Sequence, residues 1–442
     1  MEETLRTVAV WQLIAAVVIF IACYVLIVSE KVDRSLVAIC GALLVIILGI
    51  VDFHDSYVKY IHWETLFLLL GMMMLIGIAS RSGIFQYIAI RTAQSAGGNP
   101  VRILVRLAIL SAAASAFIDN ITMVLLIVPI TIAIAELLHI SPTPFLITQI
   151  FAINLGGGAT LVGDPSNIII GTAASLSFND FLLHLTPIML VLIILTILFA
   201  MFYFKKNLNI KDKYKDTLMD TDPSDYIADS ALAKKSVVIF ILTLIGFLTH
   251  QYLNLEPAVV ALTGSASLML IGTSRKDMLE IYHSVEWVTI FFFSGLFVLV
   301  GGLVEVGIIN KMATWMVSVT GDSIVLSSLS ILWGIGILSS FVDNIPLVAT
   351  MTPLIHDMCS QMTLAPSEVN TLWWSLALGV CLGANGTLIA ASANLIVATL
   401  AARNDTPISF VDFLKISIMV APVSLVIATI YVFLVFLKIG FA

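Results

Sequence analysis

The 442-residue chain is 60% hydrophobic and only 11% charged, with a mean hydropathy of +1.08. These values lie far outside the range of soluble domains and indicate a polytopic membrane protein. The formal net charge of −7 says little, because in a membrane chain the placement of Lys and Arg among the loops is what matters.

Eight apolar segments are long enough, or nearly so, for a membrane-spanning helix of about 20 residues. In chain order they cover residues 8–28, 35–51, 63–79, 181–204, 237–253, 258–271, 287–306 and 413–437. The first segment has neither a basic start nor a small-residue cleavage site, so we expect it to be retained as a span.

Four further apolar regions are interrupted. Residues 101–138 break at the sequence FIDN, and residues 323–358 break at FVDN. Residues 144–174 and 372–402 are each long enough for one tilted helix but contain Gly, Asn and small polar residues. Irregular backbone at membrane depth is tolerated only where protein or water lines it. We therefore expect these four regions to form the interior, as two re-entrant hairpins and two broken helices.

An internal repeat organises the chain. The segment WETLFLLLGMMMLIGIASRSGI aligns with WVTIFFFSGLFVLVGGLVEVGI, and the same offset aligns FIDN with FVDN. After small shifts, GGGATLVGDPSN matches GANGTLIAASAN. The first alignment pairs Gly71 with Gly295, Gly77 with Gly301 and Gly83 with Gly307, and we interpret the first two pairs as helix-packing positions.

The predicted organisation is two repeats joined by a charged linker. The first repeat comprises a scaffold at residues 1–100 and transport elements at 101–204, and the second a scaffold at 236–322 and transport elements at 323–442. If the FIDN and FVDN regions are re-entrant, each repeat crosses five times and the second is inverted. The positive-inside rule then favours outside termini and a cytoplasmic, poorly ordered linker at residues 205–235, which holds seven lysines.

The glycine- and asparagine-rich interruptions predict a binding site. In inverted-repeat transporters, unwound backbone and half-helix ends meet near the midplane and bind ions. Packing alone would not require polar groups such as Asp164 there, since they are costly in hydrocarbon. The predicted substrate- and ion-binding residues are Asp119, Asn120, Thr122, Gly156, Gly157, Gly158, Thr160, Asp164, Ser166, Asn167, Asp343, Asn344, Asn385, Gly386, Thr387, Ser392 and Asn394.

Asp119 and Asp343 stand at the two predicted hairpin tips, each followed by Asn. A carboxylate there can hold Na⁺ or carry a proton, or it can simply cap the half-helix that follows. We expect a Na⁺ site at Asp119, Asn120, Asp343 and Asn344, and no cofactor beyond a coupling Na⁺ or H⁺. Asp164 has no acidic counterpart, because Ala391 stands at the matching position.

Other polar residues have simpler interpretations. Glu305 fits an interfacial ion pair or a relay, His184 and His250 fit structural roles, and Asp180 and Asp412 fit helix N-caps. We expect no Lys or Arg in the core. The sequence has no Walker loop, metal-ligand cluster or nucleophile elbow, which argues against an ATP-driven pump or an enzyme.

The motifs FIDN with a following VPI, NLGGGATLVGDPSNIII and SSFVDNIPLVATMTP resemble the ion transporter superfamily, and within it the branch of arsenite permeases, the melanosomal P protein and sodium/proton antiporters. The resemblance implies a scaffold, a mobile transport domain, an elevator motion and a homodimer formed through the scaffold. In the dicarboxylate branch the tips carry Ser-Asn-Thr, whereas this chain has Asp119-Asn120 and Asp343-Asn344.

Three functions follow as hypotheses. The first is a secondary transporter of a small inorganic ion or a neutral oxyacid such as arsenite, driven by protons or sodium. The second is a carboxylate carrier for citrate- or dicarboxylate-like substrates, and the third, which ranks last, is an anion channel. In each case the partners are the lipid bilayer, the substrate and a second copy of the chain, without nucleic acid, and the location is the cell (inner/cytoplasmic) membrane.

Overall fold

The fold is all-helical. The computed structural model describes residues 9–29, 31–205, 208, 218–321, 323–362 and 364–436, and no strand occurs within these ranges. Seven helices among them are long and apolar enough to cross a membrane, namely α1, α4, α7, α11, α13, α16 and α22 with its π-helical extension. Each of the ten predicted crossings corresponds to a helix or to a broken pair of helices, so the predicted fold class is confirmed.

The first repeat contains α1 (Val10–Ser29), α2 (Arg34–Ile47), α3 (Phe53–Asp55), η1 (Ser56–Tyr60), α4 (Trp63–Ser80), α5 (Ile84–Ser95), α6 (Pro100–Ser115), α7 (Asn120–Leu137), α8 (Thr143–Gly157), α9 (Pro165–Ala174), α10 (Phe178–His184) and α11 (Thr186–Phe204). The predicted interruptions in this repeat are confirmed. One separates α6 from α7, and the other separates α8 from α9.

The second repeat follows the 3₁₀ turn η3 (Pro223–Tyr226). It contains α13 (Ser230–Thr249), α14 (Pro257–Gly272), η4 (Arg275–Asp277), α15 (Met278–His283), α16 (Trp287–Glu305), α17 (Ile308–Thr320), α18 (Ile324–Ser339), α19 (Asn344–Gln361), α20 (Pro366–Gly383), α21 (Ser392–Arg403), α22 (Phe410–Tyr431) and η5 (Val432–Phe436). Breaks lie between α18 and α19 and between α20 and α21, as predicted.

In the scaffold, helices of one repeat pack against helices of the other. Helix α2 packs against α16, and α14 packs against α4. A Cβ atom on Gly295 would lie 2.6 Å from the backbone carbon of Ala38, and one on Gly71 would lie 2.7 Å from that of Ala261. No side chain fits between such close backbones, so the packing role predicted for these two glycines is confirmed.

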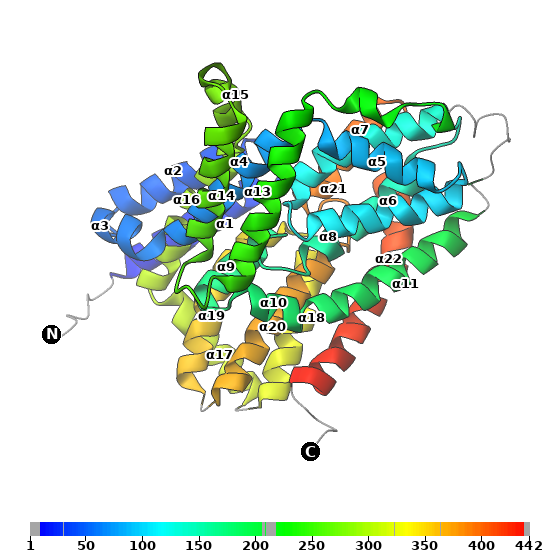
Figure 1. Cartoon of the computed structure of the whole chain (residues 1–442). Helices are drawn as coiled ribbons and strands as arrows, with labels where there is room; N and C mark the ends of the chain where they lie inside the picture. Colours follow the sequence, from blue (N-terminus) through cyan, green and yellow to red (C-terminus); the bar gives the residue numbers. More distant parts are fainter. Residues whose placement is uncertain are drawn as a thin grey trace.

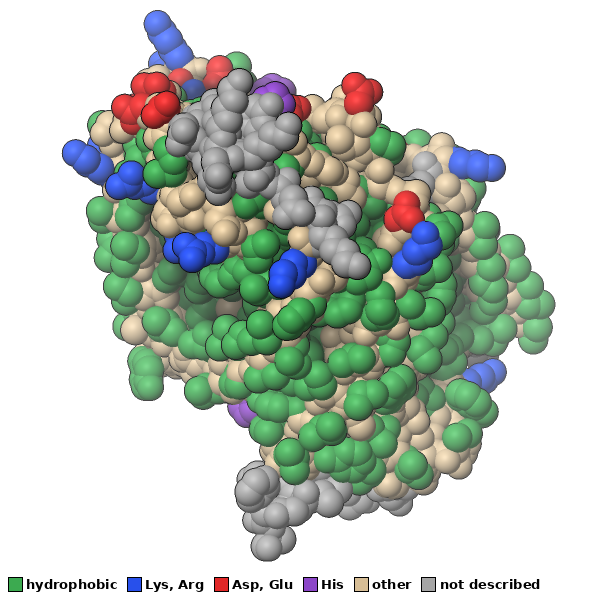
Figure 2. Space-filling view, turned by 90° about the vertical axis from the view of Figure 1, so that its right-hand side faces the viewer, with side chains coloured by type: hydrophobic (Ala, Val, Ile, Leu, Met, Phe, Trp, Pro, Cys, Tyr) green, Lys and Arg blue, Asp and Glu red, His purple; other side chains and the backbone are tan. Residues whose placement is uncertain are grey.

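Burial separates central from peripheral helices. In α4 and α16, 67% of the spanning window is buried inside the protein, against 17% in α1 and 28% in α13. The peripheral helices therefore present their apolar side chains outward. A broad band of hydrophobic side chains covers the middle of the face shown in Figure 2, with most of its charged side chains above the band. Such a surface is suited to lipid rather than to water.

The two hairpins occupy opposite ends of the molecule. In Figure 1, α6 and α7 lie in the upper part, whereas α18 and α19 lie in the lower part. Figure 1 also shows α22 running from the upper part to the lower part, toward the C-terminal end. Two equivalent hairpins at opposite ends are the arrangement that an inverted repeat produces.

The longer helices α5 and α17, the short helices α3 and α15, and one helix break were not predicted. Helices α5 and α17 each begin directly after a glycine in the left-handed region, Gly83 with φ 78° and Gly307 with φ 74°. They join the scaffold to the hairpins, and α17 meets α18 at 119°. The predicted single span at residues 181–204 is divided into α10 and α11, because the chain leaves the helical hydrogen-bond pattern at Leu185, just before Pro187.

The expectation of a poorly ordered linker is wrong for residues 218–229. Leu218 is fully buried, and the Gln94 Nε2 group donates to the carbonyls of Leu218 at 3.0 Å and Thr221 at 2.6 Å. The Ala228 N–H donates to the Ser82 carbonyl at 3.0 Å. This part of the linker is therefore folded against α5 and the turn before it. The same expectation for residues 206–207 and 209–217, and the orientation predicted for the two termini at 1–8 and 437–442, fall outside the described residues.

Candidate functional site

Three aspartates cap the half-helices of the interior. Asp119 Oδ1 accepts from the Thr122 N–H at 3.0 Å, and Asp343 Oδ1 accepts from the Ile345 N–H at 3.3 Å. Asp164 accepts from the Ser166 N–H at 2.8 Å and also from the Ser166 hydroxyl. The capping role foreseen for the two hairpin tips is confirmed, and it leaves the second oxygen of each carboxylate available for other partners.

The starts of four helices meet at one small cavity of about 40 Å³. Helices α7 and α19 come from the two hairpins, and α9 and α21 from the two broken helices. The polar side chains that line this tip cavity are Asp119, Asn120, Asp164, Asp343, Asn344 and Ser392. The structure thus brings six of the predicted site residues together, drawn from both repeats.

A hydrogen-bond network fixes the first hairpin tip. Asn120 donates from Nδ2 to Asp164 Oδ2 at 2.8 Å and accepts at Oδ1 from the Ser115 hydroxyl at 2.7 Å. In the second repeat, Asn344 accepts the matching bond from Ser339 at 2.8 Å. The second repeat has alanine where Asp164 stands, so the two tips share one hydrogen bond and differ in the other.

The remaining predicted site residues do not line the tip cavity. Asn154 Nδ2 donates across the repeats to Asn385 Oδ1 and Asn394 Oδ1, both at 3.0 Å. Asn167 Nδ2 donates to the Thr160 carbonyl at 2.9 Å and the Gly158 carbonyl at 3.3 Å. The residues in question are Thr122, Gly156, Gly157, Gly158, Thr160, Ser166, Asn167, Asn385, Gly386, Thr387 and Asn394. They lie outside the lining of the cavity, and the amides of Asn167 and Asn394 among them donate to backbone carbonyls of the broken helices.

The glycine stretch is helical rather than extended. Gly156 and Gly157 end α8, and neither they nor Gly158 has a positive φ. Their counterpart Gly383 lies where a Cβ atom would come 2.6 Å from the Gly336 carbonyl oxygen. These glycines therefore permit close approach of the broken helices to the hairpins, which the sequence alone did not indicate.

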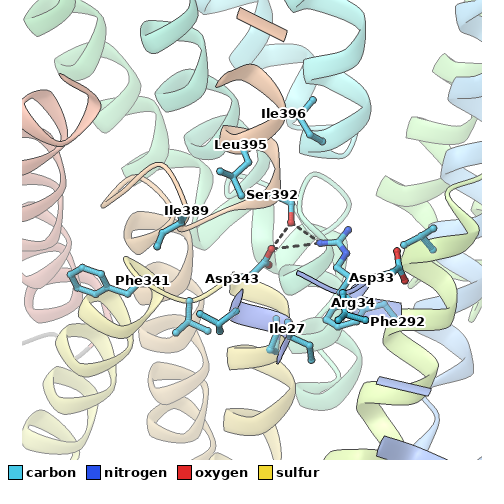
Figure 3. A pocket seen from close by; sticks show the side chains of 15 residues that line it. Ile27, Asp33, Arg34, Phe292, Phe341, Asp343, Ile389, Ser392, Leu395 and Ile396 are labelled. Carbon is cyan, nitrogen blue, oxygen red and sulfur yellow. Dashed lines mark hydrogen bonds and ion pairs between the residues drawn. The ribbon is translucent and has the colours of Figure 1, made fainter. Parts of the chain in front are cut away.

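The expectation that no Lys or Arg reaches the core is wrong, because one arginine does. Arg34, the first residue of α2, reaches the second hairpin tip, with Nη1 3.7 Å from Asp343 Oδ2 and 2.6 Å from Ser392 Oγ (Figure 3). The three groups border a second, larger cavity of about 330 Å³, whose other walls are mainly apolar. Arg34 directly precedes the predicted span at residues 35–51, and no local sequence pattern marks the direction of a side chain at a helix start.

Glu286 is a second residue that the sequence did not indicate. It directly precedes α16 on the scaffold side, and its Oε2 accepts from the Thr289 hydroxyl at 3.2 Å. Burial, followed by the neighbouring Asp119 carboxylate, raises the pKa of Glu286 to about 7. An acidic group of the scaffold therefore faces the first hairpin tip, as Arg34 faces the second.

The donor set of the tip cavity suits a small cation. Three carboxylates and two amides surround a space with room for an ion or a few waters, far below the 300–1,000 Å³ of drug-sized ligand sites. In this structure the three carboxylates line the cavity without converging into a cluster of His, Cys, Asp or Glu that could hold a metal ion, among the described residues. The carboxylate oxygens of Asp119, Asp164 and Asp343 are hard ligands, which suit alkali ions, and each carboxylate can also take up a proton.

The simpler interpretations of other polar residues agree with their contacts. Glu305 Oε1 accepts from Lys59 Nζ at 3.0 Å, as an interfacial ion pair would. His184 Nδ1 lies 2.8 Å from the Asp180 carbonyl oxygen, and His250 Nδ1 lies 2.9 Å from that of Leu255. Both histidines therefore have local backbone partners.

The predicted N-caps of α10 and α22 were wrong, because each N-cap lies three residues before the predicted aspartate. Ser177 and Ser409 are the N-cap residues, and Asp180 and Asp412 stand three positions later. In α10, the Asp180 carboxylate accepts from the Ser177 N–H at 2.8 Å, and the Asp180 N–H donates back to the serine hydroxyl at 3.1 Å. This reciprocal capping box forms because a serine hydroxyl reaches the third N–H while the aspartate reaches back.

Comparison with known proteins identifies relatives along nearly the whole chain. An uncharacterized transporter of Mycobacterium tuberculosis is 41% identical over 425 residues, which cover 95% of this chain and 98% of that protein. The mouse P protein is 28% identical over 509 residues, which cover 97% of this chain and 61% of the P protein. The crystal structure of the Alcanivorax borkumensis YdaH transporter matches the fold with a TM-score of 0.62 at 13% identity, covering 93% of this chain and 99% of that one.

The family model described as CitMHS, citrate transporter, matches residues 24–379. That range contains the first scaffold half from the end of α1 onward, the second scaffold half, both hairpins and the first broken helix. Together with the P protein relationship and the YdaH-like fold, it confirms the resemblance found in the sequence. The chain is therefore a secondary transporter that belongs to the CitMHS citrate transporter family, within the ion transporter superfamily.

Proposed function

We propose that this transporter couples a Na⁺ or H⁺ gradient to the movement of a small inorganic ion or a neutral oxyacid. The observation that carries the proposal is the meeting of Asp119 and Asp343 at one cavity of about 40 Å³. One carboxylate comes from each repeat, and each lies at the tip of a hairpin that approaches from its own end of the protein.

Charge and size both favour a cation in the tip cavity. Four helix N-termini attract negative charge, but the side chains there already supply three carboxylates. Those carboxylates are costly at membrane depth unless a cation, a proton or a donor compensates them. Because the cavity is far too small for citrate, the tip is better suited to the coupling ion than to a large substrate.

The transport elements are suited to moving as a unit, in an elevator motion. The buried side chain of Asn154 bonds to Asn385 and Asn394 across the repeats, which ties α8 to the α20–α21 break. The scaffold is held separately by the close α2–α16 and α4–α14 contacts. We propose further that scaffold surfaces pair in a homodimer in the cell membrane, with the linker on the cytoplasmic side.

A carboxylate carrier is the second candidate, and Arg34 favours it. The cavity of about 330 Å³ borders Arg34, Asp343 and Ser392 and has room for a small carboxylate. A guanidinium is the side chain best matched to a carboxylate. An anion channel ranks last, because it would not need two inverted halves with matched acidic tips.

Reconstitution of the purified protein into liposomes tests the proposal. Vesicles with an imposed Na⁺ gradient, or with an imposed pH gradient, would be supplied with arsenite or with citrate. We expect uptake of arsenite or another small ion that depends on one of the two gradients, with ²²Na⁺ flux or a trapped pH dye reporting the coupling ion. Gradient-driven citrate uptake would support the second candidate instead. Rapid downhill anion flux with no dependence on either cation gradient would contradict both and support a channel.

A further inference from the structure

One cationic side chain bridges the scaffold and the transport elements at the second hairpin tip. Arg34 belongs to the scaffold helix α2, whereas Asp343 caps α19 and Ser392 begins α21 in the transport elements. Figure 3 shows the three side chains converging, with Arg34 on one side and Asp343 and Ser392 on the other. The Ser392 hydroxyl also donates to Asp343 Oδ2, so the three groups form a closed triangle.

The scaffold holds the Arg34 side chain in this direction. Its Nη2 group lies 3.4 Å from Thr289 Oγ1, and its guanidinium carbon lies 5.3 Å from the centre of the Phe292 ring. Both partners are on α16, which packs closely against α2. The guanidinium is therefore anchored to the scaffold on one side while it pairs with the transport elements on the other.

Within the described part of the chain, such an arginine bridge is found at the second hairpin tip. Ala38 in α2 and Ala261 in α14 hold equivalent places against Gly295 and Gly71. Aligning these two alanines places Pro257 at the position equivalent to Arg34. Proline carries no charge, so the position of the second repeat that matches Arg34 supplies no cation to the first hairpin tip. An interaction that one end makes and the other lacks stabilises one orientation of the transport elements over the opposite one.

We infer that Arg34 is a one-sided latch: it holds the transport elements against the scaffold in the orientation of this structure, and a sodium ion bound at Asp343 releases it. The inference rests on the proposed cation site at the tip cavity. Asp343 lines both that cavity and the larger one beside Arg34, so a bound sodium ion and the guanidinium compete for the same carboxylate. Transport elements without the ion stay latched, which prevents uncoupled movement.

The latch is tested by the accessibility of a cysteine in the larger cavity. Ile389 lines that cavity from the segment between α20 and α21 and is 41% exposed. Ile389→Cys would be labelled with a hydrophilic maleimide in detergent, in sodium-free choline buffer and in sodium buffer. Labelling of the parent protein with its native cysteines is subtracted. Without sodium, we expect rapid labelling when Arg34 is present and severalfold slower labelling after Arg34→Gln, because the population moves away from this orientation.

Two further variants separate loss of the latch from loss of folding. Arg34→Lys keeps the charge and is expected to retain most of the labelling. Arg81→Gln removes another arginine of the scaffold, whose ion pairs among the described residues are with the scaffold residues Asp277 at 3.1 Å and Glu280 at 2.9 Å, and it is expected to leave the labelling unchanged. Unfolding would expose the cysteine and speed its reaction, which is opposite to the expected effect.

Sodium supplies the second half of the test. It should slow labelling in the protein with Arg34 and have little effect after Arg34→Gln, because the latch is already absent. Equal labelling with and without the Arg34→Gln change in sodium-free buffer, or no response to sodium when Arg34 is present, would overturn the inference. Sodium-driven transport in the same preparation would then show that the proposed function stands without the latch. Slower labelling of the variant together with the sodium response, but with no cation-driven transport, would uphold the latch and the cation site and contradict the proposed transport function.

Discussion

Removing the Asn120 amide should destabilise the protein more than removing the Asn344 amide at the matched position. Asn120 and Asn344 are 7% and 4% exposed and each accepts one serine hydrogen bond, at 2.7 and 2.8 Å. Only Asn120 also donates to a buried carboxylate, Asp164, at 2.8 Å. Both variants lose the same side-chain atoms and the same serine hydrogen bond. These two losses of unfolding free energy therefore largely cancel when Asn120→Ala is compared with Asn344→Ala.

The difference left between the two variants is the bond to Asp164. A hydrogen bond to a charged group contributes about 1.5–3 kcal/mol, and a neutral one about 0.5–1.5 kcal/mol. We therefore expect Asn120→Ala to unfold a few degrees below Asn344→Ala in detergent, followed by tryptophan fluorescence during heating. The double variant Asn120→Ala with Asp164→Ala should show strong non-additivity, because the two residues share one bond. Equal melting temperatures, or a larger loss for Asn344→Ala, would refute this reading of the two tips.

Three further outcomes follow from the scaffold and the linker. Gly295→Ala should cost about 1–3 kcal/mol, because its Cβ would meet the Ala38 backbone at 2.6 Å, whereas Gly334→Ala, with open space around it, should be neutral or stabilising in a thermal melt. Burial and the neighbouring Asp119 carboxylate raise the pKa of Glu286 from 4.5 to about 7. The wild type therefore loses stability as the pH rises from 4.5 to 7, because the unfolded chain releases this proton more readily than the folded one. Glu286→Gln should melt at a higher temperature than wild type at pH 8 and at the same temperature at pH 4.5. A cysteine replacing Asp222 should resist an impermeant thiol reagent added outside intact cells, and efficient labelling there would contradict the inverted topology.

The repeat and its glycines could be predicted from the sequence because matching residues of the two repeats are separated by a constant number of positions. Aligning Gly71 with Gly295 located two close helix contacts of the scaffold, although the partners Ala38 and Ala261 were not foreseen. The breaks at both hairpins followed from a polar residue inside a long apolar run. Such features depend on residues that are neighbours in the sequence, so they can be predicted from the sequence itself.

The parts that escaped prediction depend on the direction of a side chain or on contacts between distant segments. Arg34 follows a capping residue at a helix start, where its sequence context is that of a cytoplasmic loop. Leu218 lies in a charged linker, yet it is fully buried, and its carbonyl accepts from Gln94 on α5. Asn167 and Asn394 were grouped with the ion ligands because polarity in hydrocarbon suggests function, whereas their amides bond to the backbone of the broken helices.

Coupled transport by Asp119→Asn and Asp343→Asn measures the central claim most directly. Asparagine keeps the shape of the side chain and the ability to cap a helix, but it removes the charge that would hold a cation. The two variants would be reconstituted beside wild type and Asp412→Asn, whose exposed carboxylate accepts from the Ser409 hydroxyl at the start of α22. We expect all four proteins to fold and melt similarly, cation-driven transport to fall sharply in both tip variants, and the control to transport normally. Full coupled transport by both tip variants would contradict the claim that these carboxylates bind the coupling ion.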